Sequence, residues 1–125
     1  MIDRSVAKEL LHIKGWLESA KRIVSRGEKA YLEDTLLQEA GDSLMMKIGE
    51  AANRLSHLDV KAPPGVDWSI VIANRNFLIH RYDAADRRQT WQTLALNLPE
   101  LGESLTELFA DANRVLNNSS ELDQI

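Results

Sequence analysis

The chain has 125 residues, 44% of them hydrophobic and 27% charged, which is typical of a single globular domain and excludes disordered and fibrous classes. Its net charge of -4 argues against a broad basic surface for nucleic acid. The absence of cysteine excludes disulfides, thiolate catalysis and cysteine metal sites. Because we find neither a long uncharged apolar run nor a secretory leader, we expect a cytoplasmic protein with no membrane span.

The first predicted element is a helix that begins near Asp3 or Ser5, either of which could cap it, and ends near Gly27. Its apolar residues recur at alternating steps of four and three: Val6, Leu10, Ile13, Leu17, Ala20 and Val24. This period indicates an amphipathic helix with one buried face.

A second helix is predicted after a weak pattern between Tyr31 and Asp34. Helical spacing returns at Leu37, Leu44, Ile48, Ala51 and Leu55. The small residues Gly41, Gly49 and Ala52 leave little side-chain bulk in this helix. Another backbone could therefore approach it closely, either within the bundle or across a subunit contact.

Residues 57–66 contain the sequence PPG and are predicted to form a loop. Asp67 is placed to cap a third helix that runs toward Tyr82. The polar sequence DAADRRQ then predicts a bend, after which Asp83 or Asp86 restarts the helix.

The longest regular stripe predicts a fourth helix, with apolar residues at steps of three and four: Trp91, Leu94, Leu98, Leu101, Leu105, Leu108, Ala112 and Val115. Pro99 falls inside this stripe, so the helix should bend or restart there. We therefore predict an all-α antiparallel bundle of four main helices, with one domain over residues 1–116 and a frayed tail over 117–125.

Four polar side chains capable of chemistry lie within eight residues of the third helix: Arg75, Asn76, His80 and Tyr82. On a regular helix Arg75 and Tyr82 are nearly eclipsed, and Asn76 and His80 lie around the same side. Arg75 and His80 are about 140° apart, so they converge only if the helix ends or distorts near His80.

The same segment is locally basic, with four arginines against two aspartates: Arg75, Arg81, Arg87 and Arg88 against Asp83 and Asp86. No histidine shows a metal-ligand spacing such as HExxH, no serine lies in a nucleophile elbow, and the six glycines are scattered. We therefore expect a site without a metal or a cofactor, built on an arginine and a histidine.

Arg75 and His80 suit cleavage of RNA without a metal ion. A neutral imidazole can take the proton from a ribose 2′-hydroxyl, and a guanidinium can stabilise the negative charge on a five-coordinate phosphorus. Asn76 could orient the imidazole or the phosphate, and Tyr82 could stack on a base or hydrogen-bond a phosphate oxygen.

The same four residues also fit a structural interpretation. In that case Arg75 pairs with an acidic residue, His80 terminates the helix and Tyr82 seals the bundle. Transesterification benefits from both a base and an acid, whereas the cluster has one imidazole. A symmetric dimer would supply two, if the third helices faced each other across the two-fold axis.

The sequence RNFLIHRY, residues 75–82, resembles the R-x4-H-x-Y signature of the HEPN superfamily, and specifically of its HepT-like toxin branch. The block IGEAANRLS at 48–56, the pair DW at 67–68, Trp91 and the LPEL stretch at 98–101 are similar to that branch as well. The resemblance covers nearly the whole chain, with its blocks in the same order.

This resemblance implies an α-helical bundle that forms a homodimer with a metal-independent endoribonuclease cleft. Arg75 and His80 would be the catalytic pair, with Asn76 in support. The protein would be the toxin of a type II or type VII-like toxin-antitoxin pair that cuts tRNA or mRNA. Its antitoxin, a minimal nucleotidyltransferase, would transfer AMP to Tyr82 and so place negative charge where substrate phosphate enters.

A second interpretation belongs to another functional class. The chain could be a non-catalytic subunit that binds nucleotide or substrate within a nucleotidyltransferase complex and never cuts RNA. Both interpretations place Arg75 and His80 at phosphate.

Overall fold

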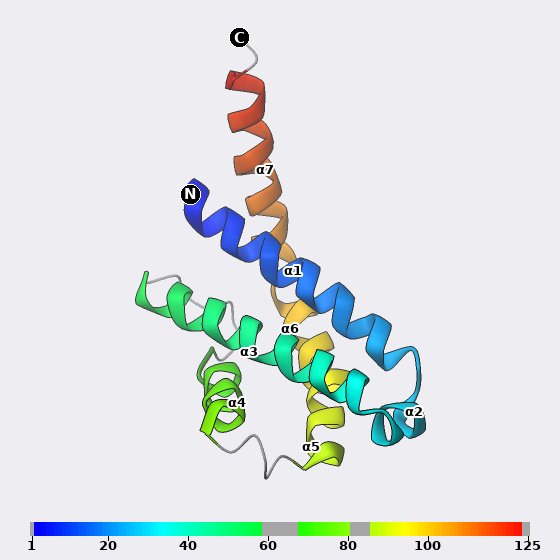
Figure 1. The fold of residues 1–125 in the computed structure, drawn as a ribbon. Coiled ribbons are helices and arrows are strands. Elements are labelled where there is room, and N and C mark those ends of the chain that lie inside the picture. The colour runs from blue at the N-terminus through cyan, green and yellow to red at the C-terminus, as the bar shows by residue number, and fades with distance from the viewer. Residues whose placement is uncertain (1, 59–67, 81–85, 124–125) are drawn as a thin grey trace.

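The computed structural model describes residues 2–58, 68–80 and 86–123, and every regular element in these ranges is helical (Figure 1). In chain order the helices are α1 (Arg4–Val24), α2 (Glu28–Glu33), α3 (Thr35–His57), α4 (Trp68–His80), α5 (Arg87–Gln92), the π-helical η2 (Thr93–Asn97), α6 (Leu98–Ser104) and α7 (Thr106–Asp123). The predicted all-α bundle is confirmed. None of the described helices combines the length and the apolar character that crossing a membrane requires.

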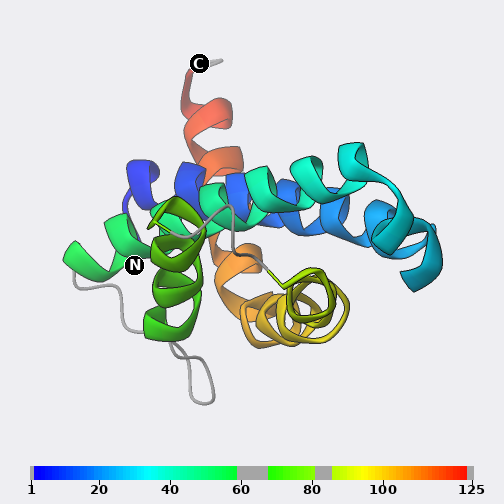
Figure 2. The same cartoon turned by 60° about the horizontal axis from the view of Figure 1, so that its bottom comes forward.

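The core forms where α1 and α3 lie side by side and run in opposite directions (Figure 1). The predicted apolar face of α1 is buried except at Val24, which is half-buried. Asp3 caps the helix by accepting a hydrogen bond of 2.8 Å from the Val6 N–H. The predicted second helix is α3, whose residues Met45, Ile48 and Leu55 are fully buried. Figure 2 gives a second view of this pair, with α4 against α3.

A short helix, α2, occupies residues where the sequence pattern is weak. Tyr31 is completely buried, and its hydroxyl lies 2.6 Å from the Thr90 hydroxyl in α5. Its ring also packs against Trp91, with the ring centroids 5.5 Å apart. Tertiary contacts of one aromatic residue therefore hold this helix, which is too short to be stable by its own propensity.

The predicted fourth helix is divided into four consecutive helical segments, α5, η2, α6 and α7. Asp86 caps α5 by accepting from the Arg88 N–H, as predicted. The π-helical turn η2 comes directly before α6, where Pro99 is the second residue, so the irregularity falls at the predicted place. Proline lacks the N–H that the preceding turn needs, which explains why the regular α-helical pattern is lost there.

A second break, at Leu105 between α6 and α7, was not predicted. Its φ of -94° and ψ of 2° lie outside the helical region although the apolar spacing continues through it. Beyond this break, α7 crosses α1 and runs to Asp123 (Figure 1). The division of the chain at residues 116 and 117 stays a prediction.

Candidate functional site

Helix α4, which carries Arg75, Asn76 and His80, packs on α3 around Gly49. Gly49 is buried, and a Cβ built there would lie 2.3 Å from the Cβ of Arg75 and 3.0 Å from the carbonyl oxygen of Val71. Both distances are shorter than van der Waals contact, so the backbone of α4 occupies the space that a side chain at this position would need. The close approach predicted for the small residues of this helix is confirmed, and here it is made within the bundle.

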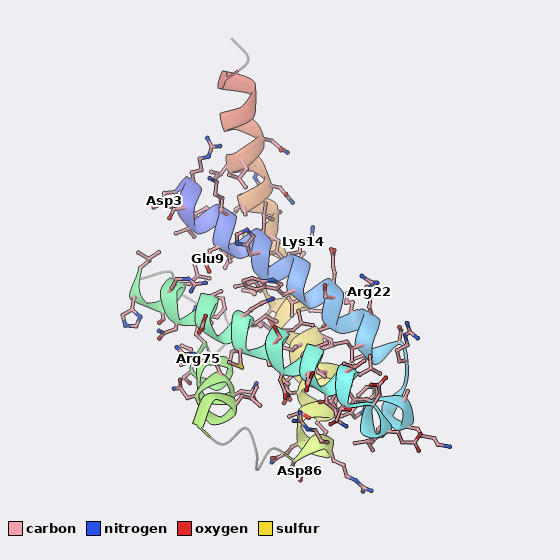
Figure 3. All side chains as sticks on the ribbon, in the orientation of Figure 1. Asp3, Glu9, Lys14, Arg22, Arg75 and Asp86 are labelled. Carbon is pink, nitrogen blue, oxygen red and sulfur yellow. The ribbon has the colours of Figure 1, made fainter. Side chains whose placement is uncertain are left out.

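Arg75 lies at the junction of α3 and α4 (Figure 3). Its side chain is half-buried, and its Nε atom is buried without a hydrogen-bond partner. Among the residues that the structure describes, no carboxylate pairs with it. The structural interpretation of Arg75, an ion pair with an acidic residue, is therefore not found in the described part of the chain.

Arg87 has a different environment. Its Nη1 atom lies 2.7 Å from a carboxylate oxygen of Asp42, a residue of α3 with 3% of its surface exposed. The hydrogen bond to Asp42 raises the pKa of Arg87, against an opposing effect of burial. Arg87 therefore serves the contact between α5 and α3, so this arginine of the locally basic segment is engaged within the fold.

Sequence reasoning missed Asp42. The residue lies 45 positions from Arg87, so local spacing could not reveal the pair. A weaker signal was present, because Asp42 falls on the same helical face as Met45 and Gly49, and an acidic residue on a buried face needs a partner. Thr90 completes this cluster by donating to the Arg87 carbonyl oxygen at 3.1 Å.

The other predicted site residues are placed only in part. Asn76 is exposed on α4, on the same stripe as the exposed residues Ser69 and Ala73. His80 is the last described residue of α4, so its convergence with Arg75 stays a prediction. The side chain of His80 and the whole of Tyr82 lie outside the described residues, so their roles stay predictions.

Fold and site together define an all-α bundle of the HEPN type, with an R-x4-H-x-Y segment that begins on α4. The comparison with protein families agrees. The model of the family described as Ribonuclease HepT-like matches residues 13–108, which include the whole segment, and the chain belongs to this family. No solved structure matches the chain.

Proposed function

We propose that this protein is a metal-independent endoribonuclease of the toxin type, in which Arg75 and His80 are the catalytic residues and Asn76 supports them. The observation that carries the proposal is the state of Arg75 within a chain of the HepT-like ribonuclease family. Its guanidinium is seated against α3 with a buried Nε–H that has no partner among the described residues. The buried Nε is closed to an external anion, but the residue is only half-buried, so a substrate phosphate would bind the outer Nη groups of this guanidinium.

The reaction follows from these groups. The neutral imidazole of His80 takes the proton from a ribose 2′-hydroxyl, and the 2′ oxygen then forms a bond to the adjacent phosphorus. Arg75 stabilises the additional negative charge while the bond from phosphorus to the 5′ oxygen breaks. A second imidazole donates a proton to that leaving oxygen, which yields a cyclic phosphate and a free 5′-hydroxyl. DNA lacks the 2′-hydroxyl and would not react.

A homodimer would supply the second imidazole. The apolar residues of α4 are spread around the whole helix, and the only described element against which it packs extensively is α3. Helices that are apolar all round are normally covered on more than one side. The exposed described residues Ser69, Ala73 and Asn76 form one stripe of α4 by the helical period. A second copy against this stripe would bring two copies of the segment together around a two-fold axis.

Regulation by a nucleotidyltransferase antitoxin is part of the proposal. Tyr82 lies two residues after His80, so AMP attached to its hydroxyl would bring charge and bulk next to the catalytic residues. We expect cells that express the chain to stop growing and to recover when the antitoxin is present. Mass spectrometry should then find one AMP unit on Tyr82, and Tyr82→Phe should cut RNA but escape neutralisation.

The test of the nuclease proposal is cleavage of RNA by the purified protein in the presence of a chelator. His80→Ala should lose about 10²- to 10⁴-fold in rate, which is the usual contribution of a general base. The matched control is Arg88→Ala, which removes an exposed arginine of the same basic segment and should leave the rate unchanged. Equal activity of His80→Ala and the unmodified protein would end the proposal. Tight nucleotide binding without any cleavage would favour the non-catalytic subunit instead.

A further inference from the structure

Gly49 occupies an unusual position among the helical glycines of the described residues. At Gly15 an added Cβ would meet nothing within 4 Å, and at Gly102 it would meet only Leu17 Cδ1, at 3.4 Å. At Gly41 the nearest atom is Leu94 Cδ1, at 2.9 Å, the end of a flexible side chain. At Gly49 the obstacles are the Cβ and Cγ of Arg75 and the backbone oxygen of Val71, and neither the Cβ nor the oxygen can move without moving α4.

The contact at Gly49 fixes the first part of the Arg75 side chain. Arginine is long and flexible, so the place of its guanidinium depends on how its first carbons are held. Here the Cβ and Cγ of Arg75 are held against the backbone of α3, and the Nε that follows them is buried. The position of α4 on α3 therefore determines the position of Arg75 Nε, the first atom of the guanidinium.

The same face of α3 also holds α5. Asp42 lies seven residues before Gly49, two helical turns or about 10.5 Å along the axis, and pairs with Arg87. The two contacts fix the described elements on both sides of the segment that contains Tyr82. Helix α3 is thus the common support of α4 and α5.

We infer that Gly49 is a positioning residue of the ribonuclease site: the absence of a side chain at this position lets α4 lie close enough to α3 to hold Arg75 in its working place. This inference rests on the proposed function. Gly49 does not touch substrate, and it acts through the position of α4 and of the Arg75 side chain on it.

The first experiment compares Gly49→Ala with Gly15→Ala and Gly102→Ala in RNA cleavage, with helical content and cooperative melting recorded for each. Gly49→Ala should lower kcat by about 10- to 100-fold, because small displacements of a catalytic group have effects of this size. KM should change much less. Gly15→Ala and Gly102→Ala should keep the kcat of the unmodified protein. A folded Gly49→Ala variant with unchanged kcat would overturn the inference.

A double variant separates positioning from a general structural effect. In an Arg75→Ala background, Gly49→Ala should cause a smaller fold-loss of activity than in the unmodified protein, since the part of its effect that passes through the guanidinium is already missing. The same fold-loss in both backgrounds would show that Gly49 is merely structural and would overturn the inference.

A measurement on the unmodified protein needs neither folding of the variant nor nuclease activity. Hydrogen exchange of arginine Nε–H groups, followed by NMR, should be at least about tenfold slower for Arg75 than for the exposed Arg88. Equal exchange rates would show that Arg75 is not held and would overturn the inference. Slow exchange at Arg75 together with an absence of RNA cleavage would refute the proposed function and leave the positioning of Arg75 established.

Discussion

Two arginines of one short segment, Arg75 and Arg87, are both held against α3, but in opposite ways. Arg87 is held by its charged end, which pairs with the buried carboxylate of Asp42. Arg75 is held by its first carbons, which contact Gly49, and its buried Nε has no partner among the described residues. This comparison indicates that an arginine paired with a carboxylate of the protein stabilises the contact between helices. An arginine that no described carboxylate pairs with is available to bind an external anion.

The largest effect that distinguishes the two regions should come from replacing each arginine by lysine. Lysine keeps the charge but loses the planar group that meets phosphate through two hydrogen bonds. Arg75→Lys should therefore reduce the single-turnover rate of RNA cleavage by about 10²-fold. Arg87→Lys should keep the rate within about twofold at a temperature where it is folded. Equal losses in the two variants would contradict the division of roles.

Removing the carboxylate that holds Arg87 should mainly affect stability. Asp42→Ala should lower the free energy of unfolding by about 2–3 kcal/mol, measured with urea, since it removes the buried carboxylate that pairs with Arg87. This is at the low end for a buried pair because the Arg87 side chain is 23% exposed and water can reach it. The control Asp111→Ala removes the exposed pair with Arg114 and should cost less than about 0.5 kcal/mol.

The pH dependence of this loss follows from the direction of the Arg87 pKa shift. A pKa raised in the folded state gives a contribution that is complete below the ordinary arginine pKa and is lost only as the pH rises through the folded value. The destabilisation by Asp42→Ala should thus be the same at neutral pH and at about pH 9. If the destabilisation by Asp42→Ala were only half as large at about pH 9 as at neutral pH, Arg87 could not be charged throughout this pH range.

A smaller effect should follow from Tyr31→Phe, which deletes one buried hydroxyl of the same cluster. The hydrogen bond to Thr90 should be worth about 1 kcal/mol in urea denaturation. Combined with Asp42→Ala, the loss should be less than additive, because Thr90 and Arg87 are themselves hydrogen-bonded. Full additivity would indicate that α2 and α3 hold α5 independently.

The smallest effect has the opposite sign. Gly15→Ala should stabilise the protein by up to about 1 kcal/mol, because Gly15 is an exposed helical residue with nothing within 4 Å of an added Cβ. The thermal midpoint should rise for this variant and fall for Gly49→Ala. A lower thermal midpoint for both variants would mean that the space around each glycine does not determine how its substitution by alanine changes stability.

The sequence predicted most of the fold because periodicity and caps are local signals. Asp3 and Asp86 cap helices as expected, and the irregularity before Pro99 lies where the missing N–H requires it. Helix α2 and the break at Leu105 were not predictable in this way. The first depends on the distant contact between Tyr31 and Thr90, and the second interrupts an unbroken apolar stripe.

The site was predictable to a smaller extent. Residue types and spacing indicated Arg75 and the close approach at Gly49, and the structure brings these two residues together. These signals did not show that Arg75 contacts Gly49 or that Arg87 pairs with Asp42. Both contacts join residues of different helices, and local spacing in the sequence does not reveal such contacts. A locally basic segment therefore predicts the presence of a functional cation but not which arginine it is.

The most direct test of the difference between the two arginines is a structure of the protein with a short RNA that carries a 2′-deoxy nucleotide at the cleavage site and cannot be cut. We predict a phosphate oxygen within hydrogen-bond distance of an Arg75 Nη atom, while Arg87 stays paired with Asp42. A phosphate bound by Arg87 or Arg88, with Arg75 turned to a carboxylate of the protein, would contradict the account.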